Sequence, residues 1–277
     1  MAEFMSLDTD YTDSVFLPRI KALVREQPQD ALYWLNWLYA LDPEFDTPDR
    51  SFIAAVTPRL REVAHQLART PQAPPVAYWY LGKKIEQLAR AKGYHNYLDT
   101  AIRYFQEALE VEHKSSQLST VKMAEYYNAL AFSYQQKAFL TDSLSLAGCF
   151  EKKLSPSLEF IDYLETSGYY ARTAINHDSL NLWAWSTLGE YYGIRYQMGE
   201  SAELKALAWQ AWQRAGELGL NLRDYQNTSE PYCFFARKFP EEYERVASAP
   251  AFFSEPLRGP RLLRVAKPDF GGQAKSE

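Results

Sequence analysis

One spacing of side chains recurs three times along the chain and constrains the fold more than any other feature. A large residue is followed by a second large residue three positions later, a small one after four and an aromatic or aliphatic one after seven. The three windows are 78–85, 127–134 and 185–192. On an α-helix these positions lie along one stripe. The small residue of each stripe, a glycine or an alanine, leaves a hole for a side chain of a neighbouring helix.

Each stripe is followed by a second helical segment with small and aromatic residues three and four positions apart. These residues are Ala101, Phe105 and Ala108, then Ser167, Ala171 and Ala174, and finally Ala208, Trp212 and Ala215. Signals for β-strands are nearly absent. The sequence therefore predicts an all-α fold with helix pairs at 76–113, 121–177 and 182–220.

Over residues 73–221 this pattern resembles the tetratricopeptide repeat. The resemblance implies antiparallel helix pairs stacked as a right-handed superhelix that binds proteins or peptides on its concave face. Residues 31–70 are similar to a further, degenerate pair, with Leu38 at the small position. Compared with the family repeat, the first and third pairs carry about seven extra residues between their helices, and the second about two dozen within 140–163. A generic helical bundle is the alternative.

Boundary signals divide the chain into three parts. Residues 1–30 are an acidic segment with a first helix, 31–248 are a single all-α domain that ends in capping helices at 222–248, and 249–277 are a basic tail with Pro and Gly. Ser155, followed by Pro156, predicts a helix start. Gly93, Gly168 and Gly219 predict helix stops or bends.

Charge is distributed unevenly, although the net charge is only −5. Residues 1–50 carry ten acidic and four basic side chains, whereas the tail carries Arg258, Arg261, Arg264 and Lys267 with no acid between 256 and 268. The negative net charge does not favour broad binding to nucleic acid. The tail is expected either to be solvated or to dock on the acidic segment, on a partner or on RNA.

Two observations predict a cytoplasmic protein that does not enter the membrane. No run approaches the roughly 18 apolar residues of a membrane span, and the start of the chain lacks a basic-then-apolar leader. Cys149 and Cys233 are the only cysteines, too few for a disulfide framework, so a reducing compartment is expected. Cys149 is expected to be a buried or loop thiol.

The titratable residues give no chemical motif. His65, His95, His113 and His177 have no metal-binding spacing, and no nucleotide or hydrolase signature occurs. No catalytic residue, metal ligand or cofactor is therefore assigned. An enzyme whose polar residues meet only in the fold is the alternative.

The resemblance also selects a binding groove, because in the family the first helix of each pair lines the concave face. The corresponding residues are Val76, Trp79, Lys83, Glu86 and Gln87, then Glu125, Asn128, Phe132, Gln135 and Gln136, and then Trp183, Ser186, Glu190 and Ile194. Trp79, Lys83, Ala129, Trp183 and Thr187 stand where chaperone-binding members clamp a carboxylate, so a chaperone tail is not the expected ligand.

The 20 tyrosines include several adjacent pairs, such as Tyr126–Tyr127 and Tyr169–Tyr170. Neighbours on a helix point about 100° apart, so one ring can pack in the core while the other meets a different surface. The sequence as a whole predicts an interaction scaffold or adaptor that binds another protein or peptide. The alternatives are an enzyme with a dispersed site and an RNA-binding protein that uses the basic tail.

Overall fold

All regular secondary structure in the described part of the chain is helical. The computed structural model describes Ala22, Glu26, Ala73 and residues 75–92, 95–114, 120–142, 156–199, 201–226 and 228–248. Their helices are α5 (Pro75–Lys92), α6 (His95–Lys114), α7 (Thr120–Thr141), α8 (Leu158–His177), α9 (Leu182–Gly199), α10 (Ala202–Glu217), α11 (Leu222–Tyr225), α12 (Glu230–Lys238) and α13 (Pro240–Ala247). No strand occurs within these ranges, which confirms the all-α prediction for them.

Some predicted features lie outside the described residues. They are the helix pair at 31–70, the turn residue Gly93, the cysteine Cys149 and the tail with Arg258, Arg261, Arg264 and Lys267.

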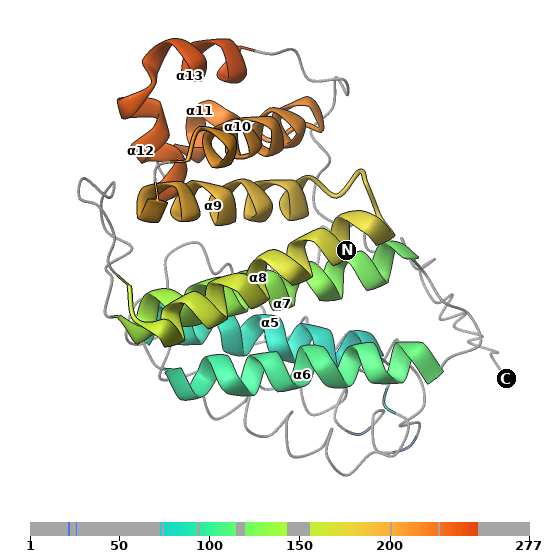
Figure 1. The fold of residues 1–277 in the computed structure, drawn as a ribbon. Coiled ribbons are helices and arrows are strands. Elements are labelled where there is room, and N and C mark those ends of the chain that lie inside the picture. The colour runs from blue at the N-terminus through green and yellow to red at the C-terminus, as the bar shows by residue number, and fades with distance from the viewer. Residues whose placement is uncertain are drawn as a thin grey trace, which may run out of the picture.

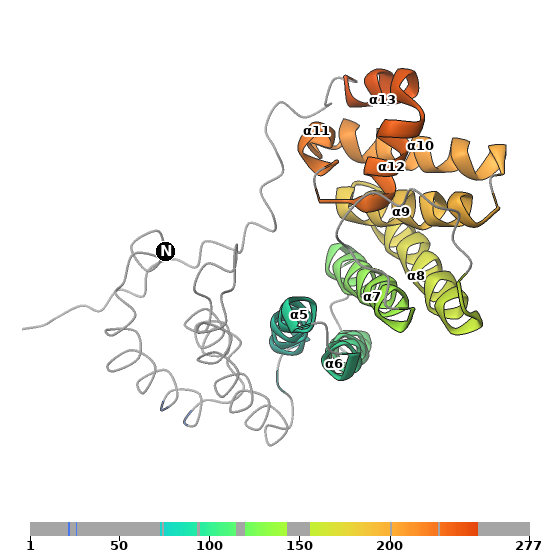
Figure 2. The ribbon, with the colours of Figure 1, turned by 90° about the vertical axis from the view of Figure 1, so that its left-hand side faces the viewer.

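Helices that follow one another in sequence pack side by side. Each of α5 to α9 contacts the helix that follows it, and α7 also touches α5 and α9. The stack runs from α5 and α6 at one end to α12 and α13 at the other (Figure 1). In the view turned by 90°, α5, α6 and α7 point along the line of sight, whereas α9 and α10 run across it (Figure 2). The direction of the helices therefore changes along the stack.

In two of the pairs, a large side chain of the second helix fills the space beside the glycine of the first helix, as the spacing predicts. A Cβ atom on Gly82 of α5 would lie 2.6 Å from the ring of Phe105 on α6. A Cβ atom on Gly189 of α9 would lie 2.5 Å from the indole of Trp212 on α10. Separations below 3.0 Å leave no room for a side chain at either glycine. These two contacts confirm the packing inferred from the spacing.

Buried side chains form three clusters that follow the order of the helices. The first lies among α5, α6 and α7 and contains Phe105. The second joins α7, α8 and α9, where Phe139 and Phe160 meet edge to face at 6.1 Å. The third joins α9, α10, α12 and α13 around Trp212 and Tyr232, whose rings are 4.9 Å apart. Burial of these rings is the main source of stability in the stack.

The turns within the first and third pairs are short. Only Gly93 and Tyr94 separate α5 from α6, and only Glu200 and Ser201 separate α9 from α10. The prediction of about seven extra residues between these helices is therefore wrong. The additional residues lengthen the helices instead, to 18 residues in α5 and 20 in α6, because buried apolar positions continue along their length.

Helix α8 begins later than predicted. Its N-cap is Ser157, whose hydroxyl accepts a hydrogen bond from the Phe160 N–H at 3.1 Å. Asp142, just after α7, accepts hydrogen bonds from the Ser157 hydroxyl at 2.6 Å and from its N–H at 2.9 Å. The predicted start at Ser155 is wrong because Asp142 fixes Ser157, rather than Ser155, at the end of the helix.

Two glycines predicted as stops behave differently. Gly219 has a φ of 109° just after α10, and the Leu220 N–H donates to the Ala215 carbonyl at 3.0 Å. This left-handed end confirms a stop there. Gly168 lies inside α8, and a Cβ on it would meet the Tyr191 ring at 2.7 Å. Gly168 is therefore a packing residue, and its prediction as a stop is wrong.

Cys233 on α12 is disulfide-bonded, whereas the sequence predicted a reducing compartment. The only other cysteine of the chain is Cys149. None of the described helices has an apolar stretch long enough to cross a bilayer.

Candidate functional site

Predicted groove residues on the first helices of the three pairs lie on adjoining helices, with α7 between α5 and α9. The ammonium group of Lys83 on α5 lies 5.9 Å from the ring centroid of Phe132 on α7. The Thr187 hydroxyl on α9 donates to the Asn128 side-chain oxygen on α7 at 3.2 Å. We call this contiguous face of α5, α7 and α9 the first-helix face. The first contact joins two predicted groove residues, and the second joins the groove residue Asn128 to Thr187, which adjoins the groove residue Ser186 in the sequence.

On α5 the first-helix face is aromatic and partly buried. Trp79 meets Tyr80 edge to face at 5.0 Å and lies 6.5 Å from Tyr126 of α7. Lys83 donates to Glu86 at 2.9 Å. Because Glu86 is buried and Lys83 half-buried, this ion pair is shielded from water on one side.

The α9 end of this face is mostly closed. Trp183 is 51% exposed, and Leu180, three residues earlier in the sequence, is 50% exposed. Ser186, Glu190 and Ile194, further along α9, are buried. They are covered because α9 packs against α7, α8, α10 and α12.

The structure therefore divides the predicted groove residues into two sets. The first set reaches solvent at least in part and consists of Val76, Trp79, Lys83, Gln87, Glu125, Asn128, Phe132 and Trp183. The second set is buried and consists of Glu86, Gln135, Gln136, Ser186, Glu190 and Ile194. Only the first set can touch a partner without movement of a helix.

The buried set contains a polar cluster around Glu190. The Tyr225 hydroxyl of α11 donates to a Glu190 carboxyl oxygen at 2.5 Å. Burial raises the pKa of Glu190, and the side chains of Ser229, Tyr225 and Gln135 lower it in part. Burial and the adjacent Glu190 raise the pKa of Tyr225 well above its usual value. We call these four residues the Glu190 cluster; it links α7, α9, α11 and the N-cap of α12.

A second surface was not selected from the sequence. Five rings of α7 and α8 alternate in a row in the order His177, Tyr127, Tyr170, Tyr134 and Tyr163; the first four are stacked, and Tyr163 is tilted against Tyr134. Successive ring centroids are 5.1, 6.1, 5.7 and 6.3 Å apart. We call this row the aromatic ladder. Its signal is a spacing of seven residues within each helix, which places every ring on one side.

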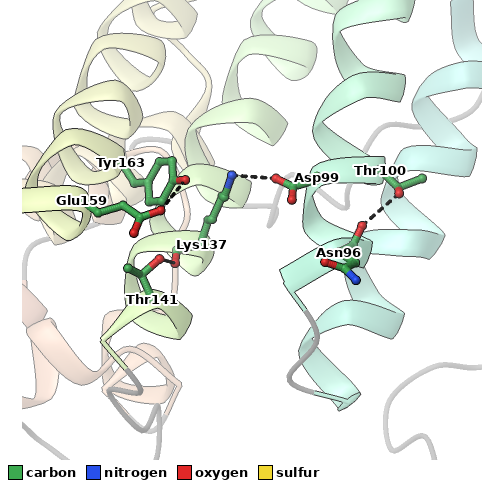
Figure 3. A network of polar contacts seen from close by, with 7 residues as sticks. All are labelled: Asn96, Asp99, Thr100, Lys137, Thr141, Glu159 and Tyr163. Carbon is green, nitrogen blue, oxygen red and sulfur yellow. Dashed lines mark hydrogen bonds and ion pairs between the residues drawn. The ribbon is translucent and has the colours of Figure 1, made fainter.

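Lys137 closes the ladder at its Tyr163 end (Figure 3). Its ammonium group lies 2.6 Å from an Asp99 carboxyl oxygen of α6 and 4.3 Å from the Tyr163 ring centroid. The Tyr163 hydroxyl donates to Glu159 at 2.9 Å. Hydrogen bonds to Asp99 and Tyr163 raise the pKa of Lys137 despite the opposing effect of burial. One cation thus joins α6, α7 and α8.

The described histidines take structural positions. His113 and His177 lie in the last turns of α6 and α8, where a cation interacts favourably with the helix dipole. Within the described ranges, no group of three or more His, Cys, Asp or Glu residues is arranged to hold a metal ion.

Comparison of the chain with protein-family models, with curated proteins and with solved structures finds no match.

Proposed function

We propose that the chain is a tetratricopeptide-like scaffold or adaptor that binds another protein or an extended peptide. The observation that carries this proposal is the indole of Trp183. The resemblance to the tetratricopeptide repeat assigns Trp183 to the partner-binding side of α9, and half of its surface is open to solvent. An exposed tryptophan on a rigid helix is a typical anchor for a protein partner.

The accessible part of the first-helix face has the mixed chemistry of a peptide-binding surface. Trp79, Phe132 and Trp183 offer apolar area, and Asn128 and Gln87 offer amide groups. Aromatic anchors supply binding free energy, while amides can pair with the backbone of an extended segment. We propose that the partner places an apolar side chain near Trp183 and runs along α7 toward α5.

The experiment uses a photo-crosslinking amino acid at position 183 in the full chain, expressed in its native cells. Tyr169 is the matched control position, since it is 60% exposed and lies on α8. The proposal expects a partner that crosslinks at 183 and not at 169. The purified partner should bind Trp183→Ala roughly thirtyfold more weakly, whereas Tyr169→Ala should bind normally.

Crosslinks that are the same at both positions, or unchanged affinity for Trp183→Ala, would remove the proposal. Because Trp183 is exposed, its replacement should change the free energy of unfolding by less than about 0.5 kcal/mol, and circular dichroism can verify the fold. A cytoplasmic location stays a prediction, and the alternatives to a scaffold stay an enzyme with a dispersed site and RNA binding by the basic tail.

A further inference from the structure

The Glu190 cluster places one carboxyl group where four elements meet. Glu190 projects from α9, Gln135 approaches from α7, Tyr225 belongs to α11 and Ser229 caps α12. Ser229 also accepts a hydrogen bond from the Tyr232 N–H at 3.4 Å. The carboxyl group therefore sits where α11 and the start of α12 attach to the preceding helices.

Among the described residues, the groups that face Glu190 are neutral. Tyr225 is titratable but protonated, and Ser229 and Gln135 carry no charge. Four described cations of the surrounding helices have partners other than Glu190: Lys137 pairs with Asp99, Arg195 with Glu165 and Arg223 with Glu244, and Lys238 lies over the Phe239 ring. No described lysine, arginine or histidine forms an ion pair with Glu190.

A buried carboxylate without a cation is costly, because hydrogen bonds from neutral groups replace only part of its hydration. The Gln135 amide lies beside the carboxyl group and is wholly buried, but it makes no hydrogen bond of good geometry in this structure. The closed arrangement therefore suits a neutral carboxyl group. Ionisation becomes favourable once α11 moves away and water reaches Glu190.

We propose that Glu190 is a proton-dependent latch, which holds α11 and α12 against α9 while it is protonated and releases them when it ionises. Release would uncover Ser186 and Glu190, the two residues of the closed part of the first-helix face that interact with Tyr225 of α11. The latch is a property of the fold and does not depend on the proposed binding function.

The sign of the effect follows from proton linkage. The closed state has the higher Glu190 pKa, so the closed state binds the proton more tightly than the open one. Between the ordinary glutamate pKa and that of the closed state, each pH unit should raise the opening equilibrium by up to about tenfold. Above that window the opening equilibrium should become constant.

Hydrogen–deuterium exchange of the full chain between about pH 5 and pH 8 tests the latch. After correction for the intrinsic pH dependence of exchange, amides of α11, α12 and α13 should open more as pH rises, relative to amides of α8. Glu190→Gln mimics the protonated state, so its opening should not depend on pH. Glu112→Gln is the matched control, because Glu112 is also buried but lies on α6.

A wild-type chain whose α11–α13 amides open equally at every pH would overturn the latch, and this result needs no variant. A Glu190→Gln chain with the wild-type slope would overturn it as well. Tyr225→Phe separates the contribution of the hydrogen bond to closure from the pH dependence that comes from Glu190. It should raise opening at all pH values but keep the slope, because Glu190 remains buried without a cation.

Discussion

Gly189 of α9 and Trp212 of α10 fit together as a hole and a knob. A Cβ atom on Gly189 would lie 2.5 Å from the Trp212 ring, and Trp212 is itself fully buried. The ring also lies against Tyr232 and Phe235 of α12. It therefore cannot move aside without disturbing the third core cluster.

Substitution of Gly189 by leucine should destabilise the fold. Overpacking of this contact is expected to lower the free energy of unfolding by about 1–3 kcal/mol in urea denaturation. Gly199→Ala is the matched control, because a Cβ there would lie within 4 Å of no atom apart from its chain neighbours and the backbone of its own helix. A leucine variant as stable as wild type would show that α9 and α10 do not pack as described.

Substitution of Trp212 and of Trp185 by alanine should lower the free energy of unfolding by different amounts. Trp212→Ala removes a fully buried ring and should lose roughly 3–5 kcal/mol. Trp185 is only partly buried, and its indole N–H donates to the Ser179 carbonyl at 2.9 Å. Trp185→Ala should therefore cost clearly less than Trp212→Ala in the same denaturant titration. Equal losses would contradict the burial pattern.

The start of α8 should depend on Ser157. Ser157→Ala removes the cap on the Phe160 N–H and the contact with Asp142, so a loss of about 0.5–2 kcal/mol is expected. Exchange of the first-turn amides of α8 should rise in parallel. Ser179→Ala provides the comparison, since only the backbone carbonyl of Ser179 bonds to Trp185. A loss as large in that variant would argue against capping.

Lys137 should contribute more than an exposed lysine does. Lys137→Met keeps the aliphatic stem but removes the ion pair with Asp99 and the cation over Tyr163, at an expected cost of about 1 kcal/mol. The side chain of Lys137 is 17% exposed, whereas that of Lys114 in its pair with Glu110 is 72% exposed. Lys114→Met should have no measurable effect. High salt should shrink the difference between Lys137→Met and wild type, because Asp99 is partly exposed.

The disulfide of Cys233 gives a chemical prediction. In protein purified without reductant, Cys233 should resist alkylation by iodoacetamide under denaturing conditions, and it should react after reduction. Peptide mass spectrometry distinguishes the two states. Alkylation of Cys233 in the unreduced, denatured protein would show that the thiol is free.

The pairing of helices could be predicted from the sequence because it depends on local spacing. The positions of Gly82 and Gly189 within their stripes indicate which side of the helix approaches its partner, and Phe105 and Trp212 supply the matching bulk. Ends of helices were less predictable. Ser155 and Ser157 are equally good caps by type, and the choice is made by Asp142, which meets Ser157 only in the fold.

The candidate surface was predictable only in part, because a stripe describes one helix and not the elements that later fold onto it. Trp183 was placed on an outer face and is exposed. Ser186, Glu190 and Ile194 were assigned to the same side of α9 as Trp183, yet neighbouring helices cover them. The hydrogen bond from Tyr225 to Glu190 joins residues 35 positions apart, and no local pattern indicates it.

The aromatic ladder has a consequence for how α7 and α8 are joined. Rings from the two helices alternate, so a slide of α8 along α7 by one turn would separate each ring from its neighbours at once. The side chains thus set the register of the pair, independently of the segment that connects the helices. Short insertions between Asp142 and Pro156 should therefore leave the alignment of α7 and α8 unchanged.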